Sequence, residues 1–254
     1  VLLVPVMRSR LLRPAFAAAR RFSAHPPGVA PPAPPAEAAA REGRSAIWAE
    51  MWGKGDAPWD NGDACVALAA WLRRQSAPGD GARALVPGCG RGYDTGVLAA
   101  AGYHAVGLDL VPAAIGEAQK FFAALPADHP LATSRDRVAL VAGDFFEADL
   151  GGQFDLIFDC TFLCALHPDV REKWADRTVS LLKPGGRLAA LVFPICDKEG
   201  GPPYALDADL VKGLLEQHDL TIVEEQDPVP EELRHSPDNP FGAHTAFIVF
   251  QKPQ

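Results

Sequence analysis

The residues from Arg83 to Leu110 constrain the fold more than any other part of the chain. They read RALVPGCGRGYDTGVLAAAGYHAVGLDL. The apolar run Ala84–Val86 leads into a glycine-rich turn, the helical stretch Val97–Ala101 follows, and a second apolar run, His104–Leu108, ends at Asp109. A strand, a glycine turn, a helix and a second strand that ends in an acid form the first half of a nucleotide-binding α/β sheet.

The spacing of the glycines narrows the class of ligand. Gly88, Gly90 and Gly92 let the backbone approach a ligand closely, and the start of the next helix offers free N–H groups. A dinucleotide-binding turn needs its third glycine at the position of Tyr93. The observed spacing suits a smaller ligand with a ribose and a carboxylate, such as S-adenosylmethionine, and Asp109 could accept both hydroxyl protons of the ribose. A turn of this kind without any ligand is the alternative.

Apolar runs and turn residues predict the remaining strands and helices. The run LLKPGGRL is predicted to stop a helix at residues 183–186, and a proline-rich excursion, residues 227–244, precedes the last strand. Alternating strands and helices with a final strand inserted antiparallel predict an α/β, Rossmann-like, seven-stranded fold of the class I methyltransferase type, with a mostly parallel sheet. The predicted helices are 66–72, 112–125, 167–182 and 206–217, and the later strands are 138–142, 154–160, 187–193, 220–225 and 246–251.

Residues 1–36 differ in composition from the rest of the chain. They contain five arginines, no acidic residue, many alanines and the proline-rich stretch HPPGVAPPAPPA. This composition predicts an organellar transit peptide, for a mitochondrion or a plastid, followed by a proline-rich linker. The alternative is a tail without an address on a cytoplasmic protein. Residues 37–254 are then expected to form one S-adenosylmethionine-dependent methyltransferase domain.

The charge of the chain limits its partners. Its 254 residues carry a net charge of −8, with an isoelectric point near 5.3. Such an acidic chain is not expected to bind nucleic acid or an anionic membrane. No apolar run approaches the roughly 18 residues that a membrane-spanning helix needs. The expected partner is a small-molecule or inorganic anion acceptor, and the sequence leaves the oligomeric state open.

Four of the five tryptophans lie between residues 36 and 76. Trp48 and Trp52 are four positions apart and would share one face of a helix, and Trp59 follows a turn that contains glycine and proline. Large rings at such positions are core anchors in one interpretation. In the other they close over the ligand, because an aromatic face stabilises a cation such as a sulfonium by about 0.5–2 kcal/mol per contact.

The predicted third and fourth strands deliver polar residues to the carboxyl edge of the sheet, where ligands of open α/β sheets lie. Asp144 and Phe145 could hold an adenine, and the alternative is a turn acid beside a core ring. Asp159 and Cys160 end the fourth strand. Asp159 and His167 could assist a protonated thiol, although structural roles are favoured for both.

The five cysteines form no C-x-x-C pair, which fits a reducing compartment better than a disulfide framework. Cys160, Cys164 and His167 are close in sequence, but their spacing matches no usual zinc pattern. Core or pocket lining is the favoured role of the two thiols, and no metal site is predicted.

Several motifs together resemble the thiopurine S-methyltransferase family, and within it the halide and thiol methyltransferase branch. They are IWAEMWGKGDAPWDNG, ALVPGCGRGYD, AVGLDLVPAAI, GDFFE, FDLIFDCTFLCAL, LLKPGGRL and PICDKEGGPPY, and the resemblance covers roughly residues 46–252. The resemblance implies that S-adenosylmethionine is the cofactor and S-adenosylhomocysteine the product. Gly88 would lie under the aminoacyl part and Asp109 would hold the ribose. Asp144 and Phe145 would hold the adenine. The residues implied in cofactor binding are Trp48, Trp52, Trp59, Gly88, Gly90, Asp109, Leu110, Asp144, Phe145 and Cys160.

Cys160 departs from the family pattern. The residue after the acid of the fourth strand lies at the methyl-transfer site, where tyrosine is expected in the halide and thiol relatives. The resemblance implies in-line methyl transfer to a small soft nucleophile: a thiol, bisulfide or a halide. Cys160 and Asp159 would be the catalytic residues, with a positioning role rather than an acid or base role. A larger thiol, a thiopurine or an arsenic species is the alternative acceptor.

Two other classes of protein stay open at this point. An NAD-dependent oxidoreductase is disfavoured by Tyr93, which stands where that class of turn has glycine. A catalytically silent S-adenosylmethionine-binding protein would keep the cofactor site and form no methylated product.

Overall fold

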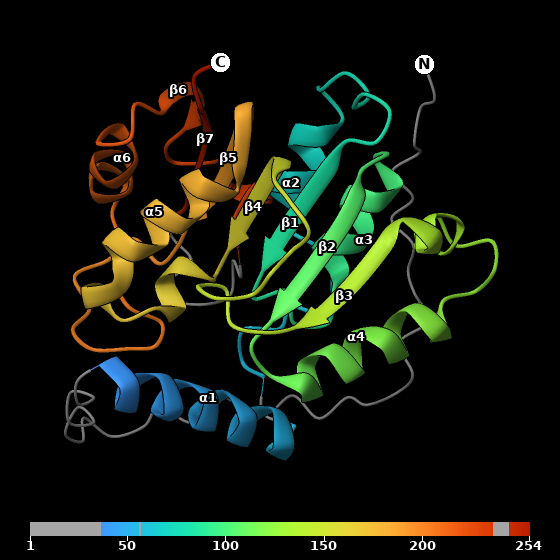
Figure 1. Cartoon of the computed structure of the whole chain (residues 1–254), viewed down its shortest axis with the longest axis horizontal. Coiled ribbons are helices and arrows are strands. Elements are labelled where there is room, and N and C mark those ends of the chain that lie inside the picture. Colours follow the sequence, from blue (N-terminus) through green and yellow to red (C-terminus); the bar gives the residue numbers. More distant parts are fainter. Residues whose placement is uncertain (1–36, 56, 236–243) are drawn as a thin grey trace. The chain divides into compact units, whose positions relative to one another are not determined.

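The structure is a computed structural model. It describes residues 37–55, 57–235 and 244–254, with side chains from Ala46 onward. The predicted leader, residues 1–36, lies outside the described residues. The helices and strands, shown in Figure 1, are α1 (Glu37–Lys54), α2 (Val66–Leu72), β1 (Arg83–Pro87), α3 (Tyr93–Ala100), β2 (His104–Asp109), α4 (Pro112–Ala124), β3 (Val138–Ala142), β4 (Phe154–Cys160), α5 (Arg171–Leu181), β5 (Leu182–Val192), α6 (Ala208–Glu216), β6 (Thr221–Gln226) and β7 (Ala246–Gln251).

The described strands form a seven-stranded sheet with the order β3-β2-β1-β4-β5-β7-β6. Neighbouring strands from β3 to β5 are parallel, whereas β7 lies between β5 and β6 and is antiparallel to both. The predicted fold is thus confirmed. The chain changes the direction in which it adds strands between β1 and β4, and ligands of open α/β sheets lie at such a switch point.

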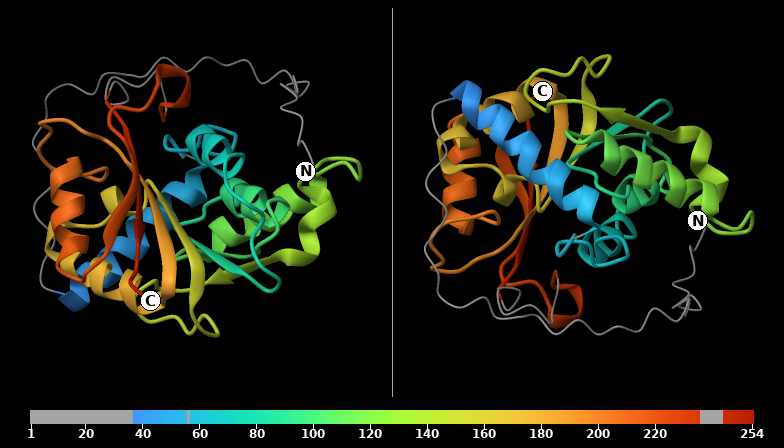
Figure 2. Two further views of the ribbon diagram at one scale, coloured as in Figure 1. Left: turned by 90° about the horizontal axis from the view of Figure 1, so that it is seen from above. Right: turned by 90° about the horizontal axis from the view of Figure 1, so that it is seen from below.

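Alternation along the strands divides the core between the two faces of the sheet, which both carry helices (Figure 2). In β4, Leu156 and Phe158 pack in a cluster with residues of α2 and α3. Ile157 packs in the other cluster, with residues of α5 and α6. The last two residues of β4, Asp159 and Cys160, therefore point to opposite faces of the sheet.

β5 begins at Leu182, earlier than the predicted residue 187. Leu182 pairs with Phe154, and the pairing then resumes between Arg187 and Leu156. Residues 183–186 therefore form a bulge within β5. The prediction that the KPGG run follows a helix is correct. The prediction that this run lies before the strand is wrong, because Leu182 already pairs with Phe154, a residue distant in sequence.

Two helices also begin at residues other than those predicted. α3 begins at Tyr93 rather than at Val97, because Gly92 caps it with a left-handed φ of 79°. α5 begins at Arg171, after a short 3-10 helix at Pro168–Val170. The first turn of α3 is thus continuous with the glycine turn, and its N–H groups start at the sheet edge.

Candidate active site at the carboxyl edge of the sheet

The glycine turn connects β1 to α3 at the switch point of the sheet. Gly88, Gly90 and Gly92 have φ angles of 62°, 52° and 79°, in the left-handed region that favours glycine. A Cβ atom on Gly88 would lie 2.8 Å from Cδ2 of Phe162. Phe162 therefore packs directly on the turn, in the space that a side chain at position 88 would need.

Asp109 ties the glycine turn to the end of β2. Its Oδ2 accepts the N–H of Gly90 at 3.0 Å, and its Oδ1 accepts the N–H of Val111 at 3.0 Å. The side chain is buried, and burial raises the pKa of its carboxyl while the two amide bonds oppose that rise. Each oxygen of a carboxylate has a second lone pair, so the fixed carboxylate can still accept a hydroxyl proton.

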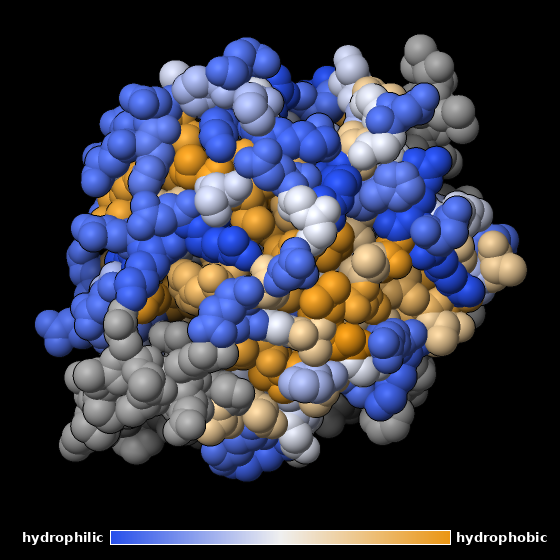
Figure 3. Space-filling model, viewed as in Figure 1, coloured by the Kyte–Doolittle hydropathy of each residue, from blue (hydrophilic) through white to orange (hydrophobic). Residues whose placement is uncertain are grey.

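The three tryptophans before α2 form one aromatic cluster beside the turn. The ring centroids of Trp48 and Trp59 are 5.0 Å apart, and those of Trp52 and Trp59 are 6.0 Å apart. A Cβ on Gly90 would lie 3.7 Å from Cζ2 of Trp52. The rings are only partly buried. On the face of the molecule viewed in Figure 1, Figure 3 shows apolar side chains bordered by hydrophilic ones.

Arg91 joins the tryptophan segment to the glycine turn. Its Nε donates to Oδ2 of Asp60 at 2.6 Å, and its Nη1 donates to Oε2 of Glu117 on α4 at 2.6 Å. The guanidinium carbon lies 5.6 Å from the ring centroid of Trp52. These contacts hold the end of α1, the loop after it and α4 around one edge of the turn.

Asp144 and Phe145 follow β3, next to Asp109. The N–H of Gly143 donates to the carbonyl of Asp109 at 2.8 Å, and Oδ1 of Asp144 accepts the N–H of Phe146 at 2.9 Å. The ring of Phe145 is buried. Leu110, the residue after Asp109, is half-buried. The groups predicted to hold a ribose and an adenine are therefore neighbours at the same edge.

Asp159 fixes the turn that follows β4. Its Oδ2 accepts the indole N–H of Trp174 on α5 at 3.0 Å, and its Oδ1 accepts the N–H groups of Phe162 at 3.3 Å and Leu163 at 3.1 Å. Burial raises the pKa of this carboxyl to about 6. Thr161 within the turn has a φ of 60°, an uncommon value for a β-branched residue. The carboxylate thus holds a strained turn in place.

Cys160 points to the other face, into a cluster that sequence reasoning did not predict. Its Sγ lies 4.0 Å from Nδ1 of His235. Hydrogen bonding with the Cys65 thiol and burial raise the pKa of the Cys160 thiol well above its usual value. The rings of His235 and Phe193 are 4.9 Å apart between centroids, and the amide of Asn61 also contacts the imidazole. No local pattern in the proline-rich excursion marks His235.

The other residues considered for acid–base or metal chemistry lie elsewhere. The His167 ring packs on Tyr204, with centroids 5.4 Å apart, and its Nδ1 accepts the N–H of Asp169 at 3.3 Å. Cys164 belongs to the core cluster of α5, on the face opposite to Cys160. Within the described ranges, no three His, Cys, Asp or Glu side chains are grouped to hold a metal ion. None of the described helices is long and apolar enough to cross a membrane.

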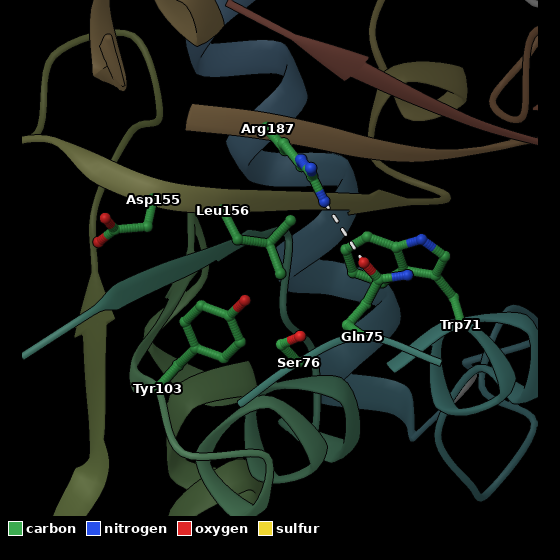
Figure 4. Close-up of a pocket in the computed structure, with 7 residues that line it drawn as sticks. All are labelled: Trp71, Gln75, Ser76, Tyr103, Asp155, Leu156 and Arg187. Carbon is green, nitrogen blue, oxygen red and sulfur yellow. Dashed lines mark hydrogen bonds between the residues drawn. The ribbon is translucent and has the colours of Figure 1, made fainter. Parts of the chain in front are cut away.

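A cavity of about 250 Å³ lies at the opposite, amino edge of the sheet (Figure 4). Asp155, near the start of β4, and Arg187, in the middle of β5, line it, and Nη1 of Arg187 donates to Oε1 of Gln75 at 3.3 Å. Oδ2 of Asp155 accepts the N–H of Arg83 at 2.7 Å. This cavity is separate from the glycine turn, so its residues provide controls for the candidate site.

Known proteins resemble this chain in sequence and in fold. A model of the family described as thiopurine S-methyltransferase matches residues 44–252. The chain is 42% identical over 163 residues to the probable thiol methyltransferase 2 of Arabidopsis thaliana, over 64% of this chain and 68% of that protein. It is 36% identical over 168 residues to thiocyanate methyltransferase 1 of Arabidopsis thaliana, over 66% of this chain and 70% of that protein.

A solved structure supports the fold independently. The 1,6-didemethyltoxoflavin-N1-methyltransferase of Burkholderia thailandensis, solved with bound S-adenosylhomocysteine, matches with a TM-score of 0.66 at 23% identity, over 89% of this chain and 95% of that one. Because the family model spans most of the chain, the predicted resemblance is confirmed. The chain belongs to the thiopurine S-methyltransferase family of S-adenosylmethionine-dependent methyltransferases.

Proposed function

We propose that this enzyme methylates a small soft nucleophile, a thiol, bisulfide or a halide, by in-line displacement. The observation that carries the proposal is the chemistry of the groups around Cys160. The Cys65 thiol and the His235 imidazole contact it, and Phe193 packs on the imidazole. The two sulfurs and the phenyl ring are weakly hydrated, so they suit a soft nucleophile that is itself weakly hydrated. The similarity to proteins named thiol and thiocyanate methyltransferases supports the same class of acceptor.

The residues of the glycine turn fit the cofactor. S-adenosylmethionine, when bound, supplies an electrophilic methyl group on a sulfonium ion. The left-handed φ angles of Gly88 and Gly90 shape a turn whose backbone can approach the aminoacyl part, and the fixed carboxylate of Asp109 has lone pairs for the ribose. The full proposed set is Trp48, Trp52, Trp59, Gly88, Gly90, Asp109, Leu110, Asp144, Phe145 and Cys160.

The protein's own contribution is to bring the acceptor to the methyl group and to exclude water. Asp159 holds the turn that follows Cys160, and Cys160 forms one wall of the proposed acceptor site. Reacting atoms held about 3–3.5 Å apart in a dry site gain reactivity without covalent catalysis. Both residues therefore act by positioning.

The test is analysis of the gas phase above the full-length protein mixed with S-adenosylmethionine and, separately, with iodide, bisulfide or an alkanethiol. The proposal expects a volatile methylated product from at least one acceptor, and none without the cofactor. Tight cofactor binding, measured by calorimetry, with no product from any soft nucleophile would instead favour a silent binding protein.

An organellar location is a separate proposal, supported by the arginine-rich, acid-free composition of residues 1–36. A fluorescent protein that carries these residues at its amino end should enter a mitochondrion or a plastid. A diffuse cytoplasmic signal would contradict the proposal.

A further inference from the structure

A buried imidazole faces the proposed acceptor site from the far end of the chain. His235 is 8% exposed and follows the short helix after β6. Its Nδ1 lies 4.0 Å from Sγ of Cys160, and its ring packs against Phe193. Cys160, which ends β4, and Phe193, which follows β5, therefore both contact His235.

The ring nitrogens of His235 have no strong hydrogen bond among the described residues. The side-chain nitrogen of Asn61 lies 3.3 Å from Nδ1 and 3.5 Å from Nε2. The two distances are nearly equal. An amide nitrogen aligned with the lone pair of one ring nitrogen would lie well beyond hydrogen-bonding distance of the other, so the Asn61 amide is not aligned with the lone pair of either nitrogen. One nitrogen of a neutral imidazole therefore keeps a lone pair that can accept a proton.

The environment of His235 keeps the ring neutral. Burial lowers its pKa to about 4 and is the sole cause of that shift. The groups that face it are the Cys160 thiol of β4, with the Cys65 thiol behind it, the amide of Asn61 and the ring of Phe193. The amide and the phenyl ring carry no charge, and the raised pKa of the Cys160 thiol keeps that thiol neutral at neutral pH.

The other candidate bases do not face this cluster. Asp159 bonds the indole of Trp174 and two turn amides on the opposite face of the sheet. His167 packs on Tyr204 and caps a short helix. Within the described part of the chain, His235 is therefore the base in contact with Cys160.

We propose that His235 accepts the proton of a neutral thiol during methyl transfer, so that a protonated thiol is the preferred acceptor of this enzyme and methyl transfer to a halide does not use His235. This inference depends on the proposed function and narrows it. The thiol sulfur forms a bond to the methyl carbon, while the methyl–sulfonium bond breaks with its electron pair moving to the departing sulfur. The S–H proton passes to His235 and then to water, so the positive charge moves from the sulfonium to the imidazole.

A weakly basic imidazole is sufficient for this step. A sulfur that has gained a methyl group and still holds its proton is itself a sulfonium, which is a strong acid. A neutral base in hydrogen-bond reach then takes the proton readily, and such catalysis contributes about 10²–10⁴-fold. A halide carries no proton and gains nothing from the imidazole.

The pH dependence of kcat/KM of the wild-type full-length protein tests the proposal without any variant. For a substituted alkanethiol that shares the cysteine side chain's pKa of about 8.5, an enzyme that uses thiolate would gain about tenfold per pH unit between about pH 6 and pH 8. An enzyme in which His235 takes the proton should show a level kcat/KM over the same range. The pH profile for iodide should be level in either case.

His235→Gln, with His104→Gln as the matched control, separates the proton role from a structural one. His104 is exposed at the start of β2, at the opposite edge of the sheet. With the alkanethiol, His235→Gln should lose about 100-fold in kcat/KM near pH 6 and recover most of it as the thiol ionises. The kcat/KM of His235→Gln for iodide and its affinity for S-adenosylhomocysteine should change less than about threefold. The kcat/KM of His104→Gln for either acceptor should also change less than about threefold.

Three results would overturn the inference. The first is a wild-type kcat/KM for the alkanethiol that rises with pH in proportion to the thiolate. The second is an equal loss of kcat/KM for the alkanethiol and for iodide in His235→Gln. The third is methylation of iodide without methylation of any thiol. Failure of the wild-type protein to methylate any acceptor would refute the proposed function itself, and so is distinguishable from these outcomes.

Discussion

Trp174 donates its indole N–H to Asp159, with Nε1 and Oδ2 3.0 Å apart, in a site where the indole is fully buried and the carboxyl is 3% exposed. This bond links α5 to the end of β4, where Cys160 is the last residue of the strand. It explains how a carboxylate at the carboxyl edge of the sheet can be structural, since its oxygens are already engaged by the indole and by backbone amides.

Replacing Trp174 with Phe should lower the free energy of unfolding by about 1–3 kcal/mol, because it leaves a buried carboxylate one donor short. Trp71→Phe is the matched control: Trp71 is buried and also donates to a carboxylate, but that of Glu224 is 30% exposed and can turn to water. Urea denaturation should show the larger loss for Trp174→Phe. Equal losses would mean that burial of the Asp159 carboxylate does not matter.

Asp159 and His235 should change stability with pH in opposite directions. The pKa of Asp159 is raised to about 6, so the folded state binds this proton more tightly and stability falls as pH rises from about 4 to 6. The pKa of His235 is lowered to about 4, so stability rises between about pH 4 and 6.5.

Asp159→Asn should therefore gain stability relative to the wild type as pH rises through this window, and His235→Gln should lose it. Each change should be about 2–3 kcal/mol across the window. Denaturation curves at intervals between these pH values measure both. Differences from the wild type that do not vary with pH would contradict the burial of these groups.

Asp109→Asn should weaken the binding of S-adenosylmethionine and S-adenosylhomocysteine about 10- to 100-fold, because an amide has one acceptor oxygen where the carboxylate has two. Asp155→Asn is the control, since Asp155 also accepts a backbone N–H from its sheet but lies at the amino edge. Titration calorimetry compares the two. Unchanged affinity in Asp109→Asn would remove the ribose contact from the proposed site.

Gly88→Ala should both destabilise the protein and weaken cofactor binding. An alanine at position 88 would have to keep a φ of 62°, and its Cβ would lie 2.8 Å from Cδ2 of Phe162. Gly81→Ala isolates the backbone penalty, of about 1–2 kcal/mol, because Gly81 has a φ of 74° with no atom within 4 Å of the added Cβ. Gly88→Ala should cost more than Gly81→Ala in thermal unfolding. Equal costs would show that Phe162 moves away freely.

The features that the sequence predicted correctly are those set by local chemistry. The glycine turn and Asp109 belong to one continuous strand–turn–helix–strand unit. The contact between Gly90 and Asp109 therefore follows from a short stretch of the chain. The spacing of Trp48 and Trp52 likewise follows from the period of a helix, and both rings meet Trp59. The mostly parallel sheet with an antiparallel last strand was predictable because the alternation of helices and strands allows few arrangements.

Pairing between distant segments determined the remaining features. The bulge in β5 exists because Leu182 pairs with Phe154, which the KPGG run alone does not reveal. Because side chains alternate along a strand, Asp159 and Cys160 point to opposite faces of the sheet. The packing of α5 on one of these faces brings the indole N–H of Trp174 to the carboxylate of Asp159.

By itself, the sequence determined a seven-stranded methyltransferase sheet and the residues expected to hold the cofactor, because both depend on short-range patterns. Only the tertiary structure brought His235 to Cys160, across 75 residues of chain, and Asn61 to His235, across 174. Such contacts are fixed by which surfaces pack together, and no residue in either segment carries a local signal of its partner.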